Sequence, residues 1–146
     1  MKAATPRTVK LDIASRIEML DMVQTVLHHL SILIGFQEDD LHFMTVAVRE
    51  SVVNAIKHGN RMDEAKRVEL SFVLHPGLLE VHVSDEGTGF DPGAVANPIA
   101  EENLLKADGR GIFFMKSFMD SVAYSFPRDG GTVVSMTKKV AAQPAS

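Results

Sequence analysis

The sequence predicts an α+β two-layer sandwich, with a mixed, mainly antiparallel sheet and helices on one of its faces. Two observations lead to this fold class. Apolar residues recur at helical spacing through residues 15–58, whereas they alternate with polar residues in short runs over 67–85 and 121–140. The helical part therefore comes first. The strand-like runs follow it, one before and one after a long, glycine-rich connection.

The first half predicts one strand and two helices. Residues 8–13 ("TVKLDI") alternate like a short strand, and Ser15 is expected to cap the first helix. Gly35 is expected to end that helix. The letters "QEDD" then open a second helix, with acidic residues where the helix dipole favours them, and it runs to His58 with Gly59 as its C-cap.

The second half predicts a hairpin, a long connection, a helix and two closing strands. The hairpin covers residues 67–85 and turns at His75-Pro76-Gly77. The connection, residues 85–111, is rich in glycine, proline and acidic residues, and loops of this length are often functional. A helical pattern follows over 112–120, and the closing strands "SVAYSF" and "TVVSMTKKV" turn at residues 128–131.

Length, composition and charge set the class of protein. The 146 residues, 45% of them hydrophobic, suit one domain over 8–140, between a flexible leader (1–7) and a flexible tail (141–146). The absence of cysteine excludes a disulfide scaffold and a thiolate zinc site. The net charge of −4 gives no case for direct nucleic-acid binding. No apolar run approaches the roughly 20 residues of a membrane span, so we expect a cytoplasmic protein without a membrane partner.

The first motif is "RESVVNAIKHGN" (49–60), which places Glu50, Asn54 and His58 at successive four-residue steps. Side chains at such steps share one face of a helix. The opposite face is apolar and carries Leu41, Met44, Val48, Val52, Ala55 and Ile56. From this stretch alone two interpretations stay open: the polar stripe faces water, as on any amphipathic helix, or it points into a site.

The second motif is "VSDEGTGFDP" (83–92), in which Asp85 directly follows a predicted strand and Gly87 and Gly89 follow at alternate positions. A carboxylate at a strand end can accept a hydrogen bond from an exocyclic amine. Glycines beside it let a flat ring or a phosphate approach the backbone. The alternative is a turn selected only for its backbone freedom.

The third motif is "DGRGIFFMKSFMD" (108–120), with Gly109 and Gly111 immediately before a predicted helix and Arg110 between them. Free N–H groups at a helix start can bind phosphate, and glycine permits close approach. The alternative is a structural helix start that happens to contain glycine. The motif is not a P-loop, because no Gly-Lys-Ser/Thr follows.

The three motifs, followed by Gly131-Thr132 in a closing strand, occur in an order that resembles a known superfamily. It is the Bergerat-type ATP-binding domain shared by DNA gyrase, the heat-shock chaperone ATPases, the histidine kinases and MutL. Within it, "VRESVVNAIKHGN", "VSDEGTGFDP" and "GRGIFFMKSFMDSV" are most similar to the small stand-alone serine kinases that act as anti-sigma factors in bacteria. The resemblance covers roughly residues 8–140.

The resemblance implies roles for the residues that match the motifs, with ATP and Mg²⁺ as cofactors. Glu50 would be the general base, and Asn54 would be a ligand of the Mg²⁺ held by the phosphates. Lys57, His58 and Asn60 are weaker candidates for a functional role.

The resemblance also implies that residues of the second and third motifs would bind the base, the ribose and the phosphates of ATP. Asp85 would bind the adenine amino group, with Thr132 in support. Gly87 and Gly89 would admit the base and ribose, and Gly109, Arg110 and Gly111 would contact phosphate. The loop over residues 92–110 would form a lid over the triphosphate.

The implied function is an ATP-binding anti-sigma factor that phosphorylates a serine on an anti-anti-sigma protein of STAS type and so controls release of a sigma factor. Relatives also imply a homodimer. The alternative is a non-catalytic switch of the same fold that binds ATP and sequesters a partner. His28 and His29 are not expected to accept phosphate, because the residues after them lack the acidic residue and proline of a phosphoacceptor histidine.

Overall fold

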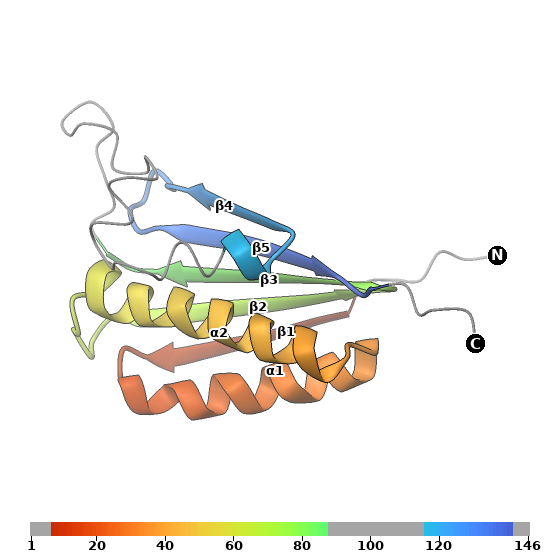
Figure 1. The fold of residues 1–146 in the computed structure, drawn as a ribbon. Helices are drawn as coiled ribbons and strands as arrows, with labels where there is room; N and C mark the ends of the chain where they lie inside the picture. The colour runs from red at the N-terminus through yellow and green to blue at the C-terminus, as the bar shows by residue number, and fades with distance from the viewer. Residues whose placement is uncertain (1–6, 88–115, 142–146) are drawn as a thin grey trace, which may run out of the picture.

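The computed structural model describes residues 7–87 and 116–141 and confirms the α+β two-layer architecture (Figure 1). Its sheet has five strands in the order β1-β2-β3-β5-β4. All four pairings among the described strands are antiparallel, where the sequence predicts a mixed, mainly antiparallel sheet. Strand β5 lies between β3 and β4, which places the chain's last strand beside the end of the hairpin.

The strands follow the alternation in the sequence. Buried side chains occupy every second position of the hairpin strands, which leaves polar residues on the other face. Strand β1 extends one residue beyond the predicted 8–13 at each end. The strand bounds are β1 Arg7–Ala14, β2 Arg67–His75, β3 Leu78–Asp85, β4 Ser121–Ser125 and β5 Val133–Lys139.

The helices cover the apolar face of the sheet. Helix α1 follows a short 3₁₀ turn, and α2 continues into a π-helical turn, η2. In Figure 1 both long helices lie over the β1–β3 part of the sheet, and β5 and β4 extend beyond α2. The bounds are η1 Ile17–Met19, α1 Leu20–Ile34, α2 Glu38–Asn54 and η2 Ala55–Gly59.

Two of the predicted helix boundaries are confirmed. Gly35 ends α1 with φ 103°, a left-handed conformation that favours glycine. Three acidic residues lie in the first turn of α2, where the helix dipole stabilises them.

Two predicted caps are wrong. Ser15 does not cap a helix, because its hydroxyl donates to the carbonyl oxygen of Lys66 at 2.6 Å. Gly59 is not a left-handed C-cap either. It belongs to η2, and its φ lies outside the positive range. A glycine after a helical run can be a C-cap or can leave room for a neighbouring side chain. Here the neighbour is Asp85, whose carboxylate leaves no space for a Cβ on Gly59.

By length and composition, the helical segment Ile17–Ile34 could cross a membrane. This corrects the expectation that no apolar run approaches the length of a membrane span. A core helix passes the same test. Four of its apolar side chains, Leu20, Val23, Leu27 and Leu30, are at most 4% exposed and belong to the core formed with α2 and the sheet. One face of this segment therefore packs inside the domain.

The predicted helix over 112–120 is described only from residue 116 onward, where residues 116–118 are helical. Phe118 stacks on Phe43 of α2, with ring centroids 4.7 Å apart and planes inclined by 19°. Buried Met119 follows. This short segment is thereby fixed to α2 before β4 begins.

Candidate functional site

The carboxylate of Asp85 lies at the end of β3 and is held by its neighbours. Its Oδ1 accepts backbone N–H bonds from Gly87 at 2.9 Å and Thr132 at 3.2 Å. Its own backbone N–H donates to the carbonyl oxygen of Thr132 at 3.0 Å. Burial raises the pKa of Asp85, and the two backbone bonds and the charge of Lys66 offset this only in part. Asp85 is therefore an oriented, partly desolvated acceptor.

Three glycines enclose this carboxylate. A Cβ on Gly59 would clash with Oδ2 of Asp85. Gly131 has a φ of 84°, and a Cβ there would clash with the backbone carbonyl oxygen of Asp85. A Cβ on Gly87 would clash with the carbonyl oxygen of Gly59. Gly87 was predicted to let a ligand approach, and the contact with Gly59 shows that the protein's own backbone already requires glycine there.

Gly59 was not predicted to belong to the site, and Gly131, although it is part of the sequence pattern that carries the family resemblance, was given no role there. Their sequence context gave other sufficient reasons for glycine, a helix end and a turn. Only the fold brings them to Asp85, which lies 26 residues from Gly59 and 46 from Gly131. A Gly-Gly pair directly before Thr132 is the one signal in the sequence that could have suggested a close approach.

Beside Asp85, Asn60 forms a junction in which each side-chain polar atom is bonded. Its Nδ2 donates to Oγ of Ser15 at 2.8 Å and to the carbonyl oxygen of Arg67 at 2.9 Å. Its Oδ1 accepts from the backbone N–H of Glu86 at 2.8 Å. Asn60 is 0% exposed. This Asn60 junction fixes the helix end to β2 and to the residue after Asp85, so Asn60 has a structural role.

The flank of α2 that carries Glu50 and Asn54 differs from the junction. Both residues are half-buried. Oδ1 of Asn54 is buried and has no hydrogen-bond partner in the described part of the chain. Asn54 is the last residue of α2, and η2, which follows it, packs on β3 next to Asp85. Such π-helical turns are frequent at functional sites. The unbonded oxygen suits a cation or a ligand donor.

The remaining predicted residues divide into two groups. Thr132 lies beside Asp85, joined to it by the two backbone bonds given above, whereas Lys57 and His58 are exposed at the helix end. The others fall outside the described residues: Gly89, Gly109, Arg110, Gly111 and the predicted lid over 92–110. The structure thus brings together the middle motif, the end of the first motif and the start of β5.

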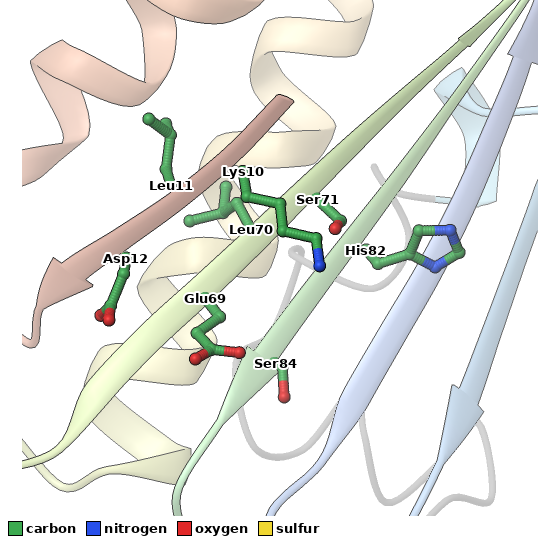
Figure 2. Close-up of a pocket in the computed structure, with 8 residues that line it drawn as sticks. All are labelled: Lys10, Leu11, Asp12, Glu69, Leu70, Ser71, His82 and Ser84. Carbon is green, nitrogen blue, oxygen red and sulfur yellow. The ribbon is translucent and has the colours of Figure 1, made fainter. Parts of the chain in front are cut away.

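A hollow of about 300 Å³ lies away from the Asp85 site. Figure 2 shows the side chains that line it, which come from β1, β2 and β3. Lys10, Glu69 and Ser84 belong to the alternate strand positions that face away from the helices. Since Asp85 follows Ser84, its side chain points to the opposite face, and the hollow is separate from the Asp85 site.

Comparison with known proteins identifies relatives along most of the chain. The serine-protein kinase RsbW of Halalkalibacterium halodurans is 29% identical over 147 residues, covering 94% of this chain and 86% of that protein. The serine-protein kinase RsbW of Listeria monocytogenes is 25% identical, covering 90% and 87%. These similarities confirm the resemblance that the three motifs predicted.

A solved structure agrees on the fold. The crystal structure of the RsbU and RsbW domains of a Mycobacterium tuberculosis protein matches with a TM-score of 0.68 and 17% identity, covering 94% of this chain and 33% of that one. The model of the histidine kinase-like ATPase domain matches residues 13–138. This match spans both helices, nearly all of β2 to β5 and the Asp85 site, so the chain belongs to the histidine kinase-like ATPase domain family.

Proposed function

We propose that this protein is an ATP-dependent protein serine kinase that acts as an anti-sigma factor. The observation that carries the proposal is the Asp85 site, a partly desolvated acceptor enclosed by glycines at the end of β3. The similarity to proteins named serine-protein kinase supports the type of reaction. The finer steps below rest on the chemistry of the described residues.

Asp85 would select the base. Oδ1 of its carboxylate is already engaged by two backbone N–H groups, which leaves Oδ2 to accept from the exocyclic amine of adenine. The bonds to Gly87 and Thr132 fix the direction of the carboxylate before a ligand arrives, so little orientational freedom is lost on binding. Guanine carries an acceptor at the corresponding position and would place oxygen against oxygen.

Asn54 fits a magnesium ligand. Mg²⁺ prefers oxygen ligands and keeps several waters, so one amide oxygen and the nucleotide phosphates suffice. Oδ1 of Asn54 is such an oxygen, buried and without a bond in the described part of the chain. When bound, Mg²⁺ neutralises charge on the phosphates. Asn54 would hold that end of the nucleotide one helical turn from Glu50.

Glu50 would act as the general base. In the transfer, the serine Oγ of a substrate protein forms a bond to the γ-phosphorus while the bond from that phosphorus to the β–γ bridging oxygen breaks. The hydroxyl proton passes to the Glu50 carboxylate, and ADP leaves. Phosphoryl transfer depends mainly on positioning and charge neutralisation, which Asn54 and the Asp85 site would supply from opposite ends of the nucleotide.

The substrate and partners follow from the family resemblance. We propose an anti-anti-sigma protein of STAS type as the phosphorylated partner and a sigma factor as the protein released when that antagonist is unphosphorylated. A cytoplasmic homodimer is part of the same proposal. A glutamate base can accept the proton of a serine hydroxyl or of water, so the serine substrate in this proposal rests on the similarity to serine-protein kinases.

The test is transfer of label from ATP to a candidate antagonist in the presence of magnesium. We expect Glu50→Gln to reduce transfer by about 10²- to 10⁴-fold, the usual contribution of a general base. The matched control is Glu38→Gln, which changes an acid in the first turn of the same helix and should leave transfer unchanged. Unimpaired transfer by Glu50→Gln would contradict the role of Glu50. ATP binding without transfer by the wild type would favour a non-catalytic switch.

A further inference from the structure

The hydroxyl groups in the two long helices behave alike with one exception. Helices α1 and α2 contain four serine and threonine residues. Three donate to the carbonyl oxygen four residues earlier, the usual bond for such side chains inside a helix. These bonds are Thr25 to Asp21 at 2.9 Å, Ser31 to Leu27 at 2.7 Å and Thr45 to Leu41 at 2.7 Å. Ser51 is the exception.

Ser51 is 1% exposed, and its Oγ has no hydrogen-bond partner in the described part of the chain. The corresponding carbonyl, that of Ala47, belongs to the same helix, but the hydroxyl does not bond to it. Burial of a hydroxyl without a bond is unfavourable, since it gives up its bonds to water and gains none. Ser31 is also a serine inside a long helix and is equally buried, yet its hydroxyl is bonded. The missing hydrogen bond is therefore specific to Ser51.

The place of Ser51 connects it with the proposed nucleotide site. It lies three residues before Asn54, which at the helical period of 3.6 residues sets the two side chains about 60° apart. Asn54 also carries a buried oxygen without a bond. The two oxygens thus lie on one flank of α2, with Ser51 on the core side, because Asn54 is half-buried and Ser51 almost fully buried.

We propose that the Ser51 hydroxyl is a further nucleotide contact, which hydrogen-bonds the adenosine part of the bound nucleotide directly or through one water. This inference rests on the proposed function. Ser51 is the deeper of the two residues, and the flat base is the part of a nucleotide that can be enclosed, whereas the phosphates need cations and water. A hydroxyl both donates and accepts, so it can pair with a ring nitrogen, an amine or a ribose hydroxyl.

The test is to compare Ser51→Ala with Ser31→Ala in the full chain. Calorimetry should give a loss of affinity for ATP of about 3- to 20-fold for Ser51→Ala, the worth of one hydrogen bond. Without nucleotide, its melting temperature should stay the same or rise, because the change removes an unbonded buried hydroxyl. Ser31→Ala should do the reverse, with unchanged affinity and a lower melting temperature from the lost bond to Leu27.

Three outcomes would overturn the inference. Unchanged ATP affinity in Ser51→Ala would exclude a contact, and a lower melting temperature without nucleotide would point to a structural bond instead. A loss seen with ATP but not with adenosine would move the contact to the phosphates. Asp85→Asn separates this inference from the proposed function. If Asp85→Asn weakens ATP binding while Ser51→Ala does not, only the inference fails. If the wild type binds no ATP, both fail.

Discussion

Two neighbouring regions of the molecule differ in whether their buried polar atoms are hydrogen-bonded to the protein. In the Asn60 junction, both polar atoms of the asparagine side chain are bonded to the protein itself, with distances of 2.8–2.9 Å. On the flank of α2, the buried oxygens of Ser51 and Asn54 have no partner among the described residues. The two regions are joined by η2, so they belong to one continuous stretch of helix.

The difference distinguishes buried polar groups that stabilise the fold from buried polar groups that are available to a ligand. A satisfied buried network rigidifies the backbone around it, and here it fixes the turn after Asp85. Unsatisfied buried oxygens cost stability, and native proteins retain them where something other than the fold requires them. Substitutions in the first region should therefore act on folding, and those in the second on nucleotide binding.

The largest expected effect is on stability, from Asn60→Ala. The change removes three hydrogen bonds, and the partly buried carbonyl oxygen of Arg67 and backbone N–H of Glu86 lose this partner, whereas Ser15 keeps its bond to Lys66. We expect the free energy of unfolding to fall by about 3 kcal/mol or more. Urea denaturation measures it, with Ser51→Ala as the control that removes an unbonded polar group. Equal stability of the two variants would contradict the distinction between the regions.

Next in size is Gly59→Ala, which tests the contact between the two regions. Its Cβ would clash with the Asp85 carboxylate, so the helix end or the carboxylate has to shift. We expect a loss of about 1–3 kcal/mol in the free energy of unfolding, typical of overpacking, together with weaker ATP binding.

Gly35→Ala is the control for Gly59→Ala. Gly35 needs its φ of 103°, but a Cβ there would meet nothing within 4 Å. It should therefore lose some stability through backbone strain and keep its ATP affinity. If Gly59→Ala likewise kept full affinity, Gly59 would not shape the site.

How much of the fold and of the site could be predicted from the sequence depends on how far apart in the sequence the interacting residues lie. The alternation in Val68, Leu70 and Phe72 predicts β2 because one side of a strand is buried, and that pattern is local. Asp85 could be proposed because its position directly after a strand is also local. The resemblance to a known family then supplied roles that neither pattern contains.

The parts that could not be predicted all depend on contacts distant in sequence. Gly59 fits a helix cap by every local criterion, and only its contact with Asp85 reveals its role. Asn60 was a weak functional candidate because nothing in the sequence indicates that it bonds to Ser15, 45 residues earlier. Ser51 was unremarked because its missing bond is visible only in three dimensions.

The smallest expected change in stability, and the one whose sign is most informative, comes from Asp85→Asn. The amide keeps an oxygen that can accept from Gly87 and Thr132, but it carries no charge to desolvate. We expect ATP affinity to fall by about 10- to 100-fold, because a charged acceptor is lost from the base site. Without nucleotide, the variant should be as stable as the wild type or slightly more stable.

The pH dependence of that stability difference follows from the raised pKa of Asp85. A carboxyl whose pKa is higher in the folded protein than its ordinary value of 3.8 stabilises the fold most when protonated, below that value. Its contribution is lost as the pH rises through the folded pKa. The stability of Asp85→Asn relative to the wild type should therefore increase from about pH 3.8 upward and level off above the folded pKa. Denaturation curves at several pH values measure this, and a relative stability that decreases with pH would mean that bonds to the carboxylate outweigh its burial.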